Sequence, residues 1–218
     1  MYDLPLFPLN TVLFPGMQLK LHIFEERYKL MIRRCIHDET PFGVILIRSG
    51  REALGPVAIT HDVGCTAKII EVQKLPFDRM NIVAVGQRRF RVRGLDHSKP
   101  YLLGDVEYFA PRDDDKPAMR RFGRSLRPLI IRYLEILASA EKVDFDPELI
   151  PRSPKSLAQI AAILLQADNA QKQELLRQDT MAQLLNLLVE IYRLETMLLG
   201  MRLNPPDDDF NIGPFSSN

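Results

Sequence analysis

The sequence predicts an α+β protein in which a β-rich part, residues 1–110, precedes a helical part, residues 118–200. The first observation is a run of short apolar segments between 42 and 109 that are separated by turns and by no helical segment. The second is a charged, proline-flanked stretch at 111–117, PRDDDKP, where the composition changes. After this predicted linker, apolar residues recur at the spacing of amphipathic helices.

The first 37 residues predict two extended segments and one helix. Segment 4–9 contains Pro5 and Pro8, which cannot donate to a sheet ladder, so we expect an edge strand or an extended segment. Apolar and polar residues alternate over 18–24, which indicates a half-buried strand. Glu25 and Glu26 then begin a helix that ends near residue 37, because carboxylates suit the positive end of a helix dipole.

Residues 42–109 have the pattern of successive strands joined by turns. The expected strands are 42–47, 64–75, 80–85, 88–95 and 101–109, with a polar loop at 48–62 and a hairpin turn at 76–79. Gly86 marks an expected bulge between two of these strands. Because no helix is interleaved, the pattern favours a closed or nearly closed antiparallel barrel.

The helical part is expected to form a bundle. Its helices are expected to begin at 118, 157, 170 and about 180, and the last to reach about 200. Pro128 lies inside the first of them, where it should kink or split the helix. Ser156 and Gln159 fit a capping box at the start of the second. Residues 201–218, rich in Pro, Asp and Ser, are expected to be a disordered tail.

The composition is typical of a soluble globular protein. Charged residues make up 26% of the 218 residues, hydrophobic residues 46%, and the formal net charge is +1. No global charge therefore favours nucleic acid or an anionic membrane as a partner. The apolar runs are too short to span a bilayer, no signal peptide is recognisable, and two cysteines make no disulfide framework. We therefore expect a cytoplasmic protein.

No set of residues has convincing catalytic or metal-binding spacing. Cys35-x-His37 and His61-x-x-x-Cys65 come closest to metal spacing, but neither has the second pair that a zinc site needs. No glycine-rich phosphate loop occurs. We therefore expect no catalytic residue, no metal and no cofactor. An enzyme that uses Cys35 or Cys65 as a nucleophile stays open as an alternative, without a motif to support it.

Arginines form two basic stripes. On the expected strand 88–95, Arg89, Arg91 and Arg93 share one face, which would suit phosphate groups. Pairing with Asp105 and Glu107 on the next strand is the favoured alternative, because opposite charges that face each other stabilise a sheet. A second stripe, on one face of the helix from 118, is a candidate partner surface and consists of Arg120, Arg124 and Arg127.

Four segments carry prolines, glycines, aromatic residues and charges at set offsets: LPLFPLNTVLFPG followed by LHIFEERY, GCTA at 64–67, GQRRFRV at 86–92, and KQELL at 172–176. They resemble the N-terminal, substrate-binding domain of Lon proteases, over about residues 4–199. The matching residues are Pro5, Phe7, Pro8, Pro15, Gly16, Phe24, Glu25, Arg27, Tyr28, Gly64, Gly86, Arg89 and Phe90. Arg177 and Gln183 depart from the pattern of the later helices and leave the β-rich part unaffected.

The resemblance implies a PUA-like β pseudo-barrel with one helix, followed by a helical bundle. It also implies a role in recognising unfolded or degradation-marked proteins. In full-length Lon this domain precedes a P-loop ATPase and a Ser–Lys protease domain, and this chain holds neither. We therefore expect a stand-alone, non-catalytic member of the family, which acts as an adaptor between unfolded or damaged proteins and a separate ATP-dependent protease. An RNA-binding module is the alternative, because PUA-like barrels include RNA binders; otherwise nucleic acid and membrane are not expected partners.

Two loops carry apolar residues where loops normally carry polar ones, and we expect these residues to contact bound protein. They are Leu54, Val57, Leu75, Phe77 and Met80. The alternative is that their side chains fold back onto the barrel. A separate expectation is that Glu25, Arg27 and Arg89 form ion pairs that tie the helix at 25–37 to the barrel.

Overall fold

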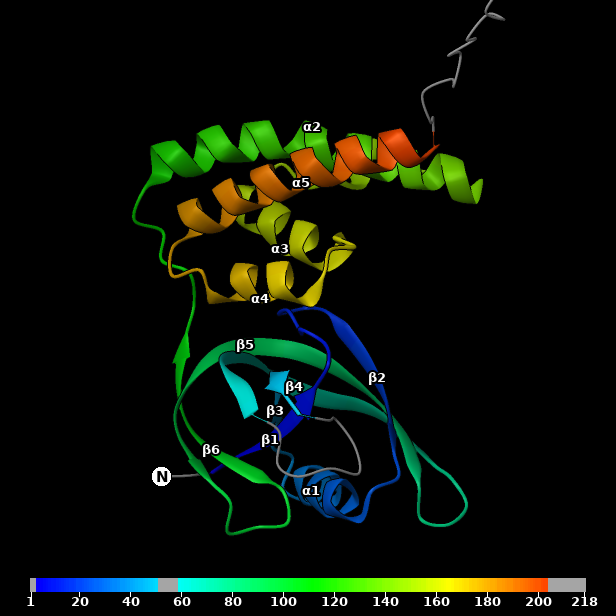
Figure 1. Cartoon of the computed structure of the whole chain (residues 1–218), viewed down its shortest axis with the longest axis vertical. Coiled ribbons are helices and arrows are strands. Elements are labelled where there is room, and N and C mark those ends of the chain that lie inside the picture. The colour runs from blue at the N-terminus through cyan, green and yellow to red at the C-terminus, as the bar shows by residue number, and fades with distance from the viewer. Residues whose placement is uncertain (1–2, 51–58, 204–218) are drawn as a thin grey trace, which may run out of the picture.

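The structure, a computed structural model, describes residues 3–50 and 59–203 and places a β-barrel beneath a layer of helices (Figure 1). The strands are β1 (Leu4–Leu9), β2 (Gln18–Ile23), β3 (Phe42–Ser49), β4 (Ile59–Lys74), β5 (Met80–Asp96) and β6 (Leu102–Phe109). The helices are α1 (Glu26–His37), α2 (Lys116–Glu141), η1 (Pro147–Leu149, a 3-10 turn), α3 (Pro154–Leu164), α4 (Asn169–Arg177) and α5 (Met181–Leu203). Helices α2 to α5 cover one end of the barrel and α1 lies at the other (Figure 1). The predicted α+β class is confirmed.

The long strand β5 closes the sheet into a barrel. β4 pairs along one edge of β5, and β2 and β6 pair with successive halves of its other edge. The strand order is β2-β5-β4-β3-β1-β6, and β6 returns to pair with the second half of β5. β2 pairs with the first half of β5. The barrel was predicted to be antiparallel, but β1 and β3 run parallel, with Phe7 opposite Val44. The chain between these two strands passes through β2 and α1, and such a long crossover permits parallel pairing.

β1 is not the edge strand that its prolines predicted, because it lies between β3 and β6. Its two pairings are offset along the strand. Pro5 is opposite Leu103 of β6, whereas Pro8 is opposite Ile45 of β3. Each proline is therefore paired with only one of the two neighbouring strands. The absence of its N–H removes no hydrogen bond to the other neighbouring strand. All six residues of β1 are buried, which accounts for the apolar composition.

The loop at 10–17 is fixed against a bulge in β5. The register of β4 and β5 shifts next to Gly86, where the bulge was predicted. Gly86 N donates a hydrogen bond to Met17 O (2.9 Å), and Gly16 N donates one to Gly86 O (2.8 Å). A Cβ at position 86 would lie 2.1 Å from the carbonyl oxygen of Phe14. Only glycine allows this close approach of two backbones.

Two of the three buried clusters are large and stabilise the molecule. One fills the barrel and is closed by α1, where the rings of Phe7 and Tyr28 stack with centroids 4.0 Å apart. The other lies among the C-terminal helices and includes Val12, Phe14 and Val63 from the β-rich part. Because the second cluster crosses from barrel to helices, the helices pack directly on the end of the barrel. The division into two domains stays a prediction.

The first C-terminal helix begins earlier than predicted and is not broken. α2 starts at Lys116, inside the predicted linker, because the Asp115 side chain accepts a hydrogen bond from the first turn (2.8 Å). The helix then continues past Pro128 to Glu141. Pro128 removes one helical N–H, and the remaining turns on either side keep the helix continuous.

The capping box predicted at Ser156 and Gln159 is wrong. α3 begins three residues earlier, with Ser153 as N-cap and Pro154 at the first helical position. Proline is favoured there because its missing N–H has no intrahelical partner in any case. Gln159 Nε2 instead donates to the carbonyl oxygen of Pro15 (3.1 Å), which ties α3 to the loop at 10–17.

The last helix begins and ends close to the predicted positions. Thr180 Oγ1 accepts a hydrogen bond from Gln183 N (3.2 Å), so Thr180 caps the start of α5. α5 runs to Leu203, so residues 201–203 are helical rather than part of the predicted tail. The remainder of that tail, 204–218, lies outside the described residues.

Candidate protein-binding site

A groove lies between the C-terminal end of α1 and the half of the β4–β5 hairpin that is nearer to its turn. It consists of two adjoining hollows of about 370 and 490 Å³, which share Ile36 and Val72. One is lined by the end of α1 and by residues 68–72 of β4, and the other continues along α1 toward the hairpin turn. Because the hollows follow a strand, their shape suits an extended chain.

The edge of β4 at this groove has no partner strand within the described residues. β3 pairs with β4 only as far as Ala67, opposite Phe42. From Lys68 to Lys74, β4 pairs with β5 alone. The backbone N–H and C=O groups of such an edge can hydrogen-bond a further strand. A register shift around Ile70 adds a bulge, and bulges limit uncontrolled pairing at sheet edges.

Apolar side chains are exposed along the groove. Ile70 and Val72 of β4 are 55% and 39% exposed, and Ile36 of α1 is 40% exposed. Phe77, at the hairpin turn, is 85% exposed. Exposed apolar groups that lie together on one surface are typical of sites that bind protein.

The hairpin turn is held against α1 by two polar contacts. Lys29 Nζ donates to the carbonyl oxygen of Phe77 (3.3 Å), and Arg33 forms an ion pair with Asp78. Phe77 and Asp78 have left-handed backbone conformations, with φ of +58° and +56°. A bulky side chain adopts this conformation at a cost in free energy, and the exposed ring of Phe77 recovers little of it by packing. Strain of this kind points to a functional role for the turn.

The structure separates the five residues predicted to contact bound protein. Phe77 is exposed at the turn, as expected, and Leu75 is half-buried in the lining of the groove. Met80 is only 6% exposed and belongs to the barrel core, so its predicted exposure is wrong. It packs in the same buried cluster as residues of α1 and also lines one hollow of the groove. Leu54 and Val57 lie outside the described residues.

Three groove residues were not predicted from the sequence. Ile36 lies in the last turn of α1, where it is partly exposed. Ile70 and Val72 belong to a strand in which Ile69 is partly buried. Adjacent residues of a strand point to opposite faces, so the pair Ile69–Ile70 already indicated that one isoleucine must face outward.

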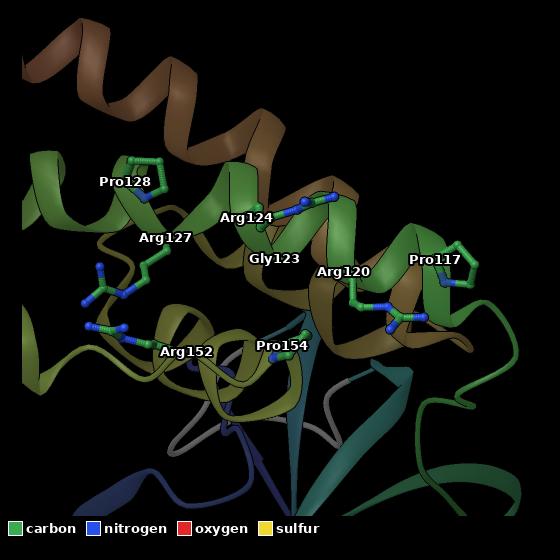
Figure 2. Close-up of a pocket in the computed structure, with 8 residues that line it drawn as sticks. All are labelled: Pro117, Arg120, Gly123, Arg124, Arg127, Pro128, Arg152 and Pro154. Carbon is green, nitrogen blue, oxygen red and sulfur yellow. The ribbon is translucent and has the colours of Figure 1, made fainter.

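The arginine stripe predicted on the first C-terminal helix lines a separate groove (Figure 2). Arg120 and Arg124 are exposed there, and Arg127 is partly buried. This groove lies on the helical part, on the far side of the molecule from α1 (Figure 1).

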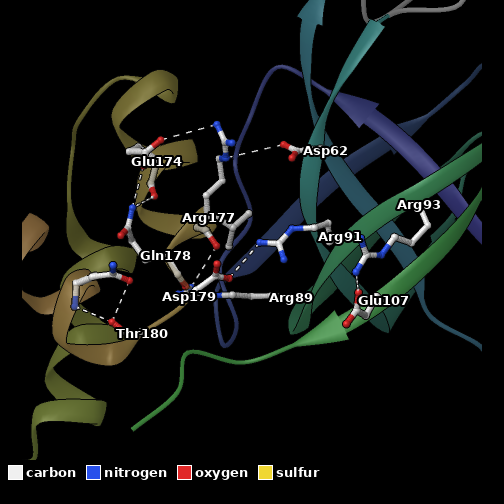
Figure 3. Close-up of polar contacts among 12 residues, drawn as sticks. Asp62, Arg89, Arg91, Arg93, Glu107, Glu174, Arg177, Gln178, Asp179 and Thr180 are labelled. Carbon is white, nitrogen blue, oxygen red and sulfur yellow. Dashed lines mark hydrogen bonds and ion pairs between the residues drawn. The ribbon is translucent and has the colours of Figure 1, made fainter. Parts of the chain in front are cut away.

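Arg89 and Arg91 of β5 connect the barrel to the helical part, so the arginines of this strand do not form a strip for phosphate groups (Figure 3). Arg89 is 6% exposed, and its Nη1 donates to the carbonyl oxygens of Leu176 (3.2 Å) and Gln178 (3.4 Å). Arg91 forms an ion pair with Asp179 (3.1 Å). These acceptors lie at the C-terminal end of α4, where the helix dipole favours a positive charge.

The other predictions for charged residues had mixed outcomes. Arg93 forms an ion pair with Glu107, the favoured cross-strand partner (Figure 3). Arg27 pairs with Glu25 (3.0 Å) within the start of α1. The predicted link of that pair to Arg89 is wrong, because Arg89 lies at the helical end of the barrel and α1 at the other end. Burial lowers the pKa of Arg89 to about 10, so the guanidinium remains charged at neutral pH.

The two cysteines are poorly suited to nucleophilic catalysis. Both are buried, and burial raises the pKa of Cys35 to about 11 and the pKa of Cys65 to about 12. The thiolate is the reactive form, and at neutral pH its population is very small. Among residues 3–50 and 59–203, no group of three or more His, Cys, Asp or Glu is arranged to hold a metal ion. No helix in this part of the chain is long and apolar enough to cross a membrane.

The closed barrel with its grooved hairpin, and the helices packed on its other end, define an α+β binding domain. The chain belongs to the family of the ATP-dependent protease La (LON) substrate-binding domain, whose sequence profile matches residues 3–193. This match confirms the resemblance that the sequence motifs indicated.

Curated relatives share this region at low identity. The Lon protease of Anaeromyxobacter dehalogenans (strain 2CP-C) is 25% identical over 200 residues, which are 91% of this chain and 24% of that protein. Lon protease 2 of Myxococcus xanthus is 24% identical over 200 residues, with the same coverage of 91% and 24%. The chain therefore spans about a quarter of the length of these relatives.

Solved structures share the fold. The Lon N-terminal domain protein from Xanthomonas campestris superposes with a TM-score of 0.63 at 25% sequence identity, covering 86% of this chain and 96% of that one. The N-terminal domain of the Mycobacterium avium complex Lon protease gives a TM-score of 0.67 at 18% identity, covering 87% and 97%. At that identity the second likeness bears on the fold alone.

Proposed function

We propose that this protein binds extended apolar segments of unfolded or degradation-marked proteins in the groove between α1 and β4. The observation that carries the proposal is the free edge of β4 from Lys68 to Lys74, flanked by exposed apolar side chains. Membership of the substrate-binding family supports a protein as the ligand. The bound segment adds to β4 as a further strand.

Strand addition suits a domain that must accept many sequences. Backbone hydrogen bonds along a sheet edge do not depend on the side chains of the added strand, so they give affinity with little sequence preference. Every second side chain of the added strand then meets the apolar residues of the groove, Ile36, Ile70 and Val72. The free edge comprises seven residues, Lys68–Lys74, and spans about 23 Å at roughly 3.3 Å per residue.

The expected affinity is modest. Complete burial of an Ile, Val or Phe side chain stabilises by about 1.5–3 kcal/mol. Three apolar side chains of the groove and Phe77 of the adjoining turn, which are 39–85% exposed, contribute about half of that each. About four backbone hydrogen bonds add roughly 1 kcal/mol each. Ordering a disordered segment costs about 2–5 kcal/mol. The balance of about 5 kcal/mol corresponds to a dissociation constant on the order of 200 µM.

The proposal includes no peptidase or ATPase activity in this chain. The bound segment passes to a separate ATP-dependent protease, for which the protein acts as an adaptor in the cytoplasm. Support comes from the family match, which is to a substrate-binding domain, and from the buried, protonated thiols. RNA is a poorer candidate ligand, because Arg89, Arg91 and Arg93 are engaged by groups of the protein itself.

Fluorescence anisotropy with a permanently unfolded protein, fluorescein-labelled and carboxymethylated α-lactalbumin, tests the proposal. Ile70→Asp places a charge beside the free edge, and Phe77→Ser removes the exposed ring. Leu149→Asp is the matched control, because Leu149 is 76% exposed and lies on η1, away from the groove. Each groove variant should weaken binding by about fivefold, which corresponds to roughly 1 kcal/mol of lost apolar contact.

The control variant and the melting curves show whether a loss of binding is specific to the groove or results from a loss of stability. Leu149→Asp should bind within about twofold of the unsubstituted protein, and Phe77→Ser should melt at an unchanged temperature, because its ring makes few contacts. Equal binding by all three variants would contradict the proposal. Lost stability at unchanged binding in Phe77→Ser would show that the ring is structural.

A further inference from the structure

A second groove lies between α2 and the start of α3, on the helical part of the molecule. Its volume is about 860 Å³. Four arginines line it, namely Arg120, Arg124, Arg127 and Arg152. Figure 2 shows the first three along α2 and Arg152 on the facing segment. At Gly123 a Cβ would lie 3.3 Å from Pro154 Cγ, so glycine allows the two helices to approach.

Two of these arginines also build the groove. Arg127 donates from Nε to the carbonyl oxygen of Ile150 (3.3 Å) and from Nη2 to that of Pro147 (3.1 Å). These bonds hold the connection before α3 against α2. Arg152 pairs with Glu148 (3.1 Å), and because both side chains are more than 70% exposed, its guanidinium stays accessible from the groove.

The remaining two arginines are Arg120 and Arg124. Within the described residues, no ion pair joins Arg120 or Arg124 to a carboxylate, although both are exposed. Arg132, exposed on the same helix, does pair with Glu135. Arg124 lies four residues after Arg120 and three before Arg127, and like charges at these spacings destabilise a helix. The fold itself therefore gains nothing from the charges of Arg120 and Arg124.

We propose that this arginine groove binds an acidic, extended segment of a partner protein. Guanidinium groups recognise carboxylates through paired, charge-assisted hydrogen bonds. Arg120 and Arg124 are separated by about 6 Å along α2, at roughly 1.5 Å per residue. Alternate residues of an extended chain lie about 6.6 Å apart and point to the same side. Acidic residues at every second position therefore match the spacing of successive arginines.

The groove favours carboxylates over nucleic acid. None of the described residues that line it is aromatic, whereas single-stranded nucleic acid is bound largely by stacking of its bases on aromatic rings. The formal net charge of +1 also gives little attraction for a phosphate backbone as a whole. The proposal is independent of the groove along β4, because the two grooves share no residue.

Fluorescence anisotropy on the full chain tests the proposal with three labelled probes. They are a twelve-residue peptide of alternating Glu and Gly, the same peptide with Gln in place of Glu, and a twelve-nucleotide oligo-dT. The test variant is the double substitution Arg120→Gln and Arg124→Gln. The control is Arg132→Gln with Arg193→Gln, which removes the same charge from exposed positions outside the groove.

We expect the Glu peptide to bind and the Gln peptide not to bind. The test variant should weaken binding of the Glu peptide by about tenfold, as the loss of two exposed charge pairs implies, and the control by less than about twofold. Phe77→Ser should leave this binding unchanged, which separates it from the groove along β4. Equal weakening in both double variants, no binding of the Glu peptide, or tighter binding of oligo-dT at this groove would each overturn the proposal.

Discussion

Replacement of Arg89 by methionine tests how the barrel and the helices are held together. The substitution keeps much of the apolar stem and removes both hydrogen bonds from the guanidinium to the carbonyl oxygens of Leu176 and Gln178. These acceptors lie 87 and 89 residues further along the chain, so the contact joins two distant parts of the sequence. Its loss leaves a buried carbonyl group without a donor.

The magnitude follows from two opposing terms. A hydrogen bond from a charged donor contributes about 1.5–3 kcal/mol, and the two bonds of Arg89 are long, at 3.2 and 3.4 Å, which places them at the weak end. Removing a buried charge returns part of this loss, because burial of the guanidinium was unfavourable. We expect a net loss of about 2 kcal/mol in the free energy of unfolding. For a protein of this size the melting temperature should fall by about 4–8 °C.

Urea denaturation followed by circular dichroism measures this loss. Arg93→Met is the matched control, because Arg93 and its partner Glu107 are more than half exposed, at 57% and 54%. The control should change the free energy of unfolding by less than about 0.5 kcal/mol. If Arg89→Met is no more destabilising than Arg93→Met, the buried guanidinium does not hold the two parts together.

Three further predictions concern the interior. Met80→Ser should cost about 3 kcal/mol, because it leaves a cavity and buries a hydroxyl; unchanged urea denaturation would place Met80 outside the core. Gly86→Ala should cost at least about 2 kcal/mol, because its Cβ would lie 2.1 Å from the Phe14 carbonyl oxygen; an unchanged melting temperature would contradict that packing. Cys35 and Cys65 should resist iodoacetamide at pH 8 until urea is added, because their raised pKa values, about 11 and 12, keep both thiols protonated; rapid labelling of the folded protein would refute their burial.

Local features of the fold could be predicted from the sequence, and long-range pairing could not. Alternation over 18–24 correctly predicted a strand, and Gly86 correctly predicted a bulge, because both depend on neighbouring residues. The position of β1 between two strands was missed, because Pro5 and Pro8 show only where a hydrogen bond is absent. Whether the absent N–H faces β3 or β6 depends on how these strands pair with β1, and both are distant from it in sequence.

The candidate site was predicted in part for the same reason. The turn at 76–79 was correctly placed, and Phe77 was correctly expected to be exposed. Met80, three residues later, is buried because α1 covers that side of the hairpin, and sequence patterns do not reveal which side a helix covers. The free edge of β4 was not foreseen, because it exists only where β3 ends opposite Ala67.

Hydrogen–deuterium exchange with and without unfolded, carboxymethylated α-lactalbumin is the most direct test of the central claim, strand addition to β4. Amides of Lys68–Lys74 that point away from β5 should exchange rapidly in the free protein and become protected when the unfolded protein binds. Protection should be confined to this edge and to the facing end of α1. Binding without any change at Lys68–Lys74, or with protection only on α2 to α5, would contradict the account.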